Sequence, residues 1–105
     1  MKAINSNKQF NDLVKGGKPF VLDFYADWCG PCQTLLPTVE KLAAEFEGKV
    51  DILKVNVDKQ QALAQKFQVR SIPAIFFVEK NKVKDRVNGL STESTLRKKI
   101  KALVA

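Results

Sequence analysis

The sequence predicts an α/β domain, and two kinds of pattern predict it. Continuous apolar runs, typical of strands buried on both faces of a sheet, cover residues 19–25 and 50–57. Segments with apolar residues at helical spacing separate and follow these runs. Because strand and helix patterns alternate, we expect a sheet with helices packed on it. The length of 105 residues predicts one domain, 1–105.

The first third of the chain is expected to hold a short strand near Ala3, a helix and a central strand. Ser6 and Gln9 fit a capping box at the start of the helix, and the glycine pair at 16–17 would end it. Residues 19–25 are too continuously apolar for a surface strand, so we place them in the middle of the sheet.

The middle of the chain predicts helix, strand and helix. Residues 31–47 have one apolar stripe at helical spacing, and residues 50–57 form the second buried strand. Asp58 is expected to cap a third helix, with Gln61 completing a capping box.

The last third predicts a hairpin followed by a helix. The segments 74–78 and 83–87 are the two strands, and Asn81 would adopt a left-handed conformation in the turn. Ser91 or Thr92 would cap the final helix. Three basic residues alternate along the second strand, so we expect them on one face, where they discourage pairing with another chain: Lys82, Lys84 and Arg86.

The net charge of +7 is concentrated near the C-terminus. Residues 80–105 hold eight Lys and Arg against two Asp and Glu, whereas residues 1–79 hold ten against nine. Such a patch fits an acidic partner or nucleic acid. We favour a solvated strand edge and helix face, because no nucleic-acid-binding motif accompanies the charge. We therefore expect no nucleic-acid partner, and no membrane partner, because no apolar run is long enough to span a bilayer.

The most distinctive stretch is Trp28-Cys29-Gly30-Pro31-Cys32, which contains the only tryptophan and both cysteines. It lies between the central strand and the second helix, so Pro31 falls in the first helical turn, where a missing N–H costs nothing. Free amides and the helix dipole favour negative charge there, so Cys29 should ionise more readily than an ordinary thiol. Cys32 faces the same side, and the two sulfurs can close a small ring reversibly.

A zinc site and a purely stabilising disulfide both fit this cysteine pair poorly. A structural zinc site needs four protein ligands, and the chain has two cysteines and no histidine, so we expect no metal. A purely stabilising disulfide would close too short a loop to restrict the unfolded chain much.

The stretch Ala26-Asp27-Trp28-Cys29-Gly30-Pro31-Cys32 resembles the active site of the thioredoxin family, and the resemblance extends over the whole chain. It implies the thioredoxin fold, a central five-stranded mixed sheet flanked by four helices. It also implies a thiol–disulfide oxidoreductase that reduces protein disulfides through a mixed disulfide. Such a protein needs no cofactor of its own and is recharged by an NADPH-dependent thioredoxin reductase. We expect it to be a monomer.

The resemblance suggests a role for each residue of the site. Cys29 would be the nucleophile and Cys32 the resolving thiol. Asp23, a charged residue in an apolar strand, would be a buried base with a raised pKa that takes the proton of Cys32. Lys54 matches the lysine beside that aspartate. A structural aspartate bonded to backbone and an exposed lysine at a strand end remain the alternatives.

Other matching positions belong to the family's substrate-contact surface: Trp28, Gly30, Pro31, Ile72, Pro73 and Gly89. Gly30 and Pro31 would also influence the reduction potential, because the residues between the cysteines affect the stability of the thiolate. The backbone at Ile72 would pair with an extended substrate segment, as in strand addition. The resemblance implies a cis bond before Pro73, which otherwise reads as an ordinary proline at a strand start. Gly89 would allow a close backbone approach. Trp28 taken alone fits a core residue, but its place beside the nucleophile favours a lid over the site.

The expected compartment is the cytoplasm, because the N-terminus lacks the apolar segment of a signal peptide. A secreted or periplasmic mature form is the alternative. Two further functions stay open. One is an extracytoplasmic carrier with dedicated partners. The other is a non-catalytic binding module that uses the same apolar surface or the basic C-terminal quarter.

Overall fold

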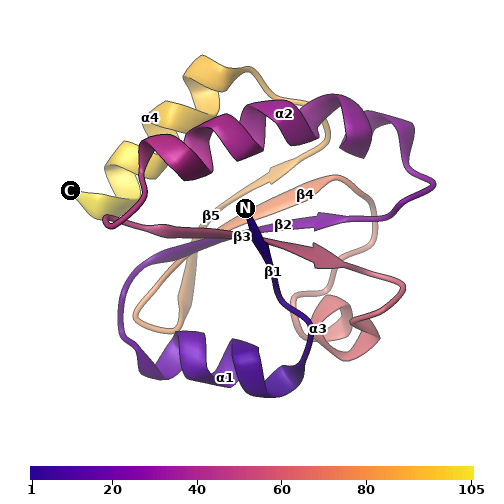
Figure 1. The fold of residues 1–105 in the computed structure, drawn as a ribbon, viewed down its shortest axis with the longest axis horizontal. Helices are drawn as coiled ribbons and strands as arrows, with labels where there is room; N and C mark the ends of the chain where they lie inside the picture. The colour runs from indigo at the N-terminus through magenta and orange to yellow at the C-terminus, as the bar shows by residue number, and fades with distance from the viewer.

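A five-stranded mixed sheet forms the middle layer of the computed structural model, which describes residues 1–105 (Figure 1). The sheet order is β1-β3-β2-β4-β5, with parallel pairing of β3 to β1 and β2, and antiparallel pairing of β4 to β2 and β5. Helices α2 and α4 cover one face, and α1 and α3 cover the other (Figure 1). The predicted fold of five strands and four helices is confirmed. The elements are β1 (Lys2–Ala3), α1 (Asn7–Lys15), β2 (Phe20–Tyr25), α2 (Gly30–Glu45), β3 (Asp51–Asn56), α3 (Gln61–Lys66), β4 (Ala74–Glu79), β5 (Lys82–Asn88) and α4 (Glu93–Val104).

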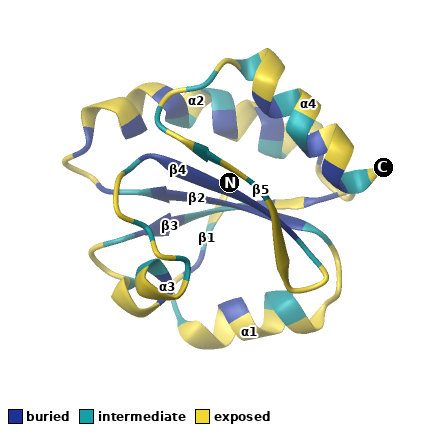
Figure 2. Cartoon of the chain, turned by 180° about the vertical axis from the view of Figure 1, so that it is seen from behind, coloured by how far each residue is buried: buried dark blue, intermediate teal, exposed yellow.

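The central strands β2 and β4 are buried along almost their whole length (Figure 2). Because side chains alternate along a strand, each strand feeds both halves of the core. Val21 of β2 packs with the residues of α2 and α4, whereas its neighbours Phe20 and Leu22 pack with those of α1 and α3. By the same alternation Asp23 lies on the face that α2 covers. The predicted central position of residues 19–25 is confirmed.

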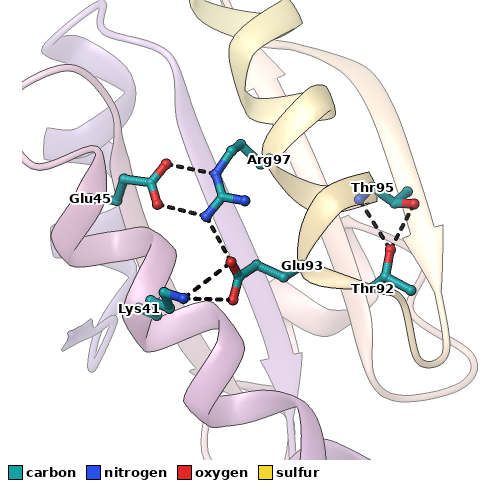
Figure 3. Close-up of polar contacts among 6 residues, drawn as sticks. All are labelled: Lys41, Glu45, Thr92, Glu93, Thr95 and Arg97. Atoms are coloured by element: carbon teal, nitrogen blue, oxygen red, sulfur yellow. Dashed lines mark hydrogen bonds and ion pairs between the residues drawn. The ribbon is translucent and has the colours of Figure 1, made fainter.

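Two of the three predicted helix caps are confirmed. Ser6 accepts a hydrogen bond from the N–H of Gln9 at 3.1 Å. Thr92 accepts one from the N–H of Thr95, also at 3.1 Å (Figure 3).

The predicted cap of the third helix is wrong. Helix α3 begins after Gln60, which makes no capping bond through its side chain. The side chain of Asn56 accepts hydrogen bonds from the N–H groups of Asp58 and Lys59, which fixes a turn before the helix. The carboxylate of Asp58 is engaged elsewhere, because it accepts a hydrogen bond from Trp28.

An ion-pair network holds α4 against α2 (Figure 3). Arg97 donates to both carboxylate oxygens of Glu45, at 2.7 and 2.8 Å, and to Glu93 at 2.8 Å. Lys41 of α2 also donates to Glu93, at 3.2 Å. The hydrogen bonds from Arg97 hold the pKa values of Glu45 and Glu93 below their usual range. Arg97 thus contributes to helix packing through a bidentate contact.

The β4–β5 hairpin has the predicted turn. Lys80 and Asn81 have φ values of 52° and 62°, so both adopt the left-handed conformation that a tight two-residue hairpin favours. The left-handed conformation of Asn81 is confirmed.

A bulge in β5 overturns one prediction. Asp85 and Val83 pair with consecutive residues of β4, so Lys84 between them has no partner. One extra residue reverses the alternation of side chains beyond it. Lys82 and Arg86 therefore lie on opposite faces of the sheet, and the prediction that the three basic residues share one face is wrong.

Candidate active site

The two cysteines lie at the N-terminus of α2 and are joined in a disulfide, with Cα atoms 5.3 Å apart. Cys29 is the N-cap residue, and Pro31 is in the first turn, where its missing N–H leaves no bond unmade. The N–H of Cys32 donates to Sγ of Cys29 at 3.2 Å. This sulfur takes the place of the oxygen that usually caps a helix. A negative charge on it is therefore stabilised by a free amide and by the helix dipole.

The two sulfur-bearing residues differ little in exposure, at 5% for Cys29 and 3% for Cys32. Exposure alone therefore does not distinguish the attacking thiol from the resolving thiol. Their positions do, because only Cys29 precedes the helix and faces its free amides. Ile72 packs against the pair, and its carbonyl oxygen lies 3.9 Å from Sγ of Cys29.

The loop beside the disulfide is tied to the end of β5. The peptide bond between Ile72 and Pro73 is cis, as the resemblance implied. The carbonyl of Pro73 accepts a hydrogen bond from the N–H of Gly89 at 2.8 Å. A Cβ atom at Gly89 would contact nothing within 4 Å, but φ at this residue is 84°. Glycine is favoured here by its backbone conformation and not by the close approach that we expected.

Trp28 is 72% exposed, which excludes a core role. Its indole Nε1 donates to the Asp58 carboxylate at 2.8 Å, so the ring is held beside the disulfide. Sequence reasoning missed this role of Asp58. A tryptophan N–H that needs an acceptor was the available signal, but nothing in the sequence identified the partner.

Leu90 is a second residue that sequence reasoning missed. It follows Gly89 directly and is one of the few large apolar side chains exposed to solvent. Trp28 and Leu90 thus offer exposed apolar area next to the loops that surround the cysteines.

Asp23 is buried in the central strand, with 2% of its surface exposed. Its Oδ1 accepts no hydrogen bond. Burial raises the pKa of this carboxyl from 3.8 to about 7, and the positive charge of Lys54 partly offsets the increase. A structural aspartate would be expected to bond to its surroundings, so the orphaned oxygen favours a chemical role.

Lys54 lies opposite Asp23 on the neighbouring strand β3. It is half-buried within the strand, which disfavours the alternative of an exposed lysine at a strand end. Its Nζ lies 5.5 Å from the centre of the Tyr25 ring. A cation held in this position keeps the ionised form of Asp23 accessible.

The site thus brings together the start of α2, the loop before β4 and the end of β5, with Asp23 and Lys54 further inside the sheet. No group of three or more His, Cys, Asp or Glu side chains is arranged to hold a metal ion. No helix is long and apolar enough to cross a bilayer. The geometry thus shows a disulfide at a helix N-terminus and, in the strand that leads to it, a buried carboxyl group with a raised pKa.

Comparison with known proteins gives consistent matches. The sequence model of the family described as "Thioredoxin" matches residues 2–102. Thioredoxin 1 of Chlorobaculum tepidum is 40% identical over 91 residues, which are 86% of this chain and 90% of that protein. Thioredoxin of Staphylococcus aureus is also 40% identical over 91 residues, covering 87% and 86% of the two chains. The crystal structure of Malassezia sympodialis thioredoxin superposes with a TM-score of 0.90 at 35% identity, covering 99% of this chain and 93% of that one.

Proposed function

The chain belongs to the thioredoxin family, and we propose that its Cys29–Cys32 pair reduces protein disulfides with Cys29 as nucleophile and Cys32 as resolving thiol. It is a thiol–disulfide oxidoreductase, and its two cysteines lie at disulfide distance. The observation that carries the assignment of roles is the N–H of Cys32 directed at Sγ of Cys29, because this contact stabilises a thiolate on Cys29 alone.

In the first step the thiolate of Cys29 attacks one sulfur of the substrate disulfide. A new S–S bond forms between Cys29 and the substrate, the substrate's own S–S bond breaks, and its second sulfur leaves as a thiolate that takes up a proton. Trp28, Ile72, Pro73 and Gly89 contact the substrate in this complex. The backbone of Ile72 pairs with an extended segment of it.

In the second step Cys32 attacks Sγ of Cys29, which breaks the mixed disulfide and releases the substrate's remaining sulfur as a thiolate. Cys32 is buried and must first lose its proton. Asp23, whose pKa is raised to about 7, is suited to accept a proton near neutral pH. Over the two steps the substrate gains two electrons and two protons, and the protein becomes the disulfide.

Three residues adjust the balance between dithiol and disulfide. Gly30 and Pro31 lie between the cysteines and shape the first turn of α2, whose free amides stabilise the thiolate. Lys54 lowers the pKa of Asp23 and so keeps that group able to exchange its proton.

The partners proposed for this chain follow from its family. Its substrates are proteins with accessible disulfides, and its electron donor is an NADPH-dependent thioredoxin reductase. We further propose a single domain over residues 1–105, a monomeric state and a cytoplasmic location, with a secreted or periplasmic form as the alternative. The family match over residues 2–102 supports the single domain.

Trapping the mixed disulfide tests the assignment of the two cysteines. Cys32→Ser is expected to accumulate a covalent adduct with a disulfide-containing protein such as insulin, joined through Cys29. The matched variant Cys29→Ser is expected to trap none. Efficient trapping through Cys32 in that variant would reverse the assignment.

Reduction of insulin disulfides, driven by dithiothreitol or by a reductase with NADPH, tests the function itself. The unaltered protein should accelerate the reaction, and the double variant Cys29→Ser, Cys32→Ser should not. A double variant that still captures the same protein partner with undiminished affinity would instead favour a non-catalytic binding module.

A further inference from the structure

The basic residues of the C-terminal quarter are unevenly paired, and the unpaired ones gather on the β4–β5 hairpin. In α4, Arg97 pairs with Glu45 and Glu93, and Lys99 pairs with Asp85 of β5 at 2.6 Å. No ion pair involves any of the four basic residues of the hairpin: Lys80, Lys82, Lys84 and Arg86. The disulfide chemistry uses none of these four residues.

A pocket of about 350 Å³ adjoins this hairpin, on the sheet face that α1 and α3 cover. The exposed strand β5 extends to the level of α1 (Figure 2), and Val83 of β5 and Phe10 of α1 both line the pocket. Three phenylalanines and Val83 make up the apolar half of its lining, no acidic residue lines it, and its two charged residues are Lys66 and Arg86.

The two cations are positioned by aromatic rings that do not neutralise them. Nζ of Lys66 lies 5.6 Å from the centre of the Phe10 ring, and the guanidinium of Arg86 lies 4.7 Å from that of Phe76. Both rings are buried, whereas Lys66 and Arg86 are exposed, so their charged groups are accessible to a ligand in the pocket. Nε of Arg86 donates to Asn88, and the rest of its donors are free, as are those of Lys66. Helix α3 and strand β5 thus present two positive groups without ion-pair partners to one pocket.

We propose that this pocket binds a small molecule that carries a phosphate and a flat ring, the chemistry of a nucleoside phosphate. The volume lies within the range of small-molecule sites. A phosphate monoester has nearly two negative charges, which Lys66 and Arg86 together match. The ring lies against the apolar wall near Val83, and the amide of Asn81 at the rim offers a donor and an acceptor to polar groups of the ring.

The position of the pocket favours a small ligand over an added strand and separates it from the redox site. The bulge at Lys84 interrupts the outer edge of β5, which disfavours regular pairing with another chain. Strand β4 begins just after Pro73, and the pocket lies along it from Phe76 to the turn at Asn81, which is about 10 to 20 Å from Pro73. The disulfide and the hairpin therefore lie at opposite ends of the sheet (Figure 1). Ligand binding and disulfide exchange are expected to be independent.

Titrations of the full chain followed by amide NMR shifts test this site, with adenosine 5′-monophosphate, adenosine and inorganic phosphate as separate probes. The monophosphate is expected to shift the amides of pocket residues and to bind about tenfold more tightly than either fragment, because only it fills both parts of the site. Lys66→Gln and Arg86→Gln should each weaken its binding about tenfold. Asn81→Asp, which keeps a residue tolerant of positive φ, should weaken it as well.

The control for net charge is Lys98→Gln, which removes an exposed, unpaired lysine of α4. It is expected to leave both the binding and the pocket shifts unchanged. Equal losses in the Lys98 and Lys66 variants would overturn the proposal, because the effect would then be net charge alone. So would phosphate binding as tightly as the monophosphate. Binding of single-stranded DNA or an acidic peptide with shifts outside the pocket, and none from the monophosphate, would overturn it too.

Discussion

Asp23 connects the chemistry of the site to the stability of the fold. Burial raises its pKa from 3.8 to about 7. Well below pH 3.8 the carboxyl is neutral in the folded and unfolded states and does not change the free energy of unfolding. Between pH 4 and 7 the unfolded chain loses this proton more readily than the folded chain. Raising the pH within this interval therefore lowers the free energy of unfolding. Above about pH 7 the destabilisation caused by Asp23 no longer changes.

Replacing Asp23 should stabilise the protein at neutral pH. The pKa difference corresponds to at most about 4 kcal/mol, from which the loss of packing in Asp23→Ala must be subtracted. Urea unfolding between pH 4 and 8 should show a gain that shrinks toward acid. In stopped-flow experiments the same variant should release reduced substrate more slowly, because Cys32 loses its proton acceptor. A variant that is less stable at pH 7 and turns over normally would make Asp23 an ordinary structural residue.

Some residues of the site can be identified from the sequence, and others cannot. Asp23 and the cysteine pair are visible because each interrupts a local pattern: one charge in an apolar strand, and two thiols at a strand–helix junction. The contact between Trp28 and Asp58 joins residues 30 positions apart, and Asp58 also fits a local capping pattern. The sequence therefore predicted that Asp58 caps the third helix, whereas in the structure it accepts the hydrogen bond from Trp28.

Strand β5 shows the same distinction between local and non-local information. The caps at Ser6 and Thr92 and the turn at Asn81 depend on a few adjacent residues, and these predictions hold. The bulge at Lys84 depends on how β5 registers against β4, which no period within β5 reveals. The basic residues alternate in the sequence, but the bulge places Lys82 and Arg86 on opposite faces of the sheet.

Neutralising the basic residues of β5 should promote self-association. β5 is an edge strand whose outer backbone groups are unpaired, and charges on such a strand oppose pairing with another copy. The triple variant Lys82→Gln, Lys84→Gln, Arg86→Gln should show an average mass in sedimentation equilibrium that rises with protein concentration. Its rate of disulfide exchange with a small substrate should be nearly unchanged.

A second triple variant controls for the loss of three charges. Lys18, Lys49 and Lys98 are exposed, lie outside β5 in the sequence and form no ion pair, so their replacement by Gln leaves the residues of the edge strand unchanged. If both triple variants associate equally, solubility through net charge explains the effect. An unchanged mass in the β5 variant would show that the bulge alone protects the edge.

The layered fold follows from the sequence more directly than its surface does. Two continuously apolar strands require cover on both faces, and the intervening helical stripes supply it. Charge pairing between elements was beyond prediction. Arg97 meets Glu45 across 52 positions, so the excess of positive charge near the C-terminus did not reveal which charges α4 neutralises. The structure shows that the unpaired remainder lies largely on the β4–β5 hairpin.

Two opposing sets of carboxyl groups shape the pH dependence of the whole protein. Hydrogen bonds from Arg97 lower the pKa values of Glu45 and Glu93, and one from Lys99 lowers that of Asp85. Their stabilising contributions are present above the unfolded values and are lost as pH falls through the lowered folded values. Asp23 acts in the opposite sense, because its raised pKa removes stability as pH rises toward 7.

The free energy of unfolding should therefore be greatest at weakly acidic pH, roughly pH 5, and should fall on both sides. Asp23→Asn, which has nearly the same shape and no titration, should flatten the decline toward neutral pH and leave the acid decline in place. Arg97→Met should reduce stability at pH 5 to 8 and make the acid decline shallower, because Glu45 and Glu93 lose the partner that lowers their pKa values. Urea melts from pH 2.5 to 8.5 at low and high salt measure both declines, and salt should weaken only the exposed ion pairs. If Asp23→Asn keeps the full decline between pH 5 and 7, another group must be responsible, and the buried carboxyl would not be the one that titrates in this range.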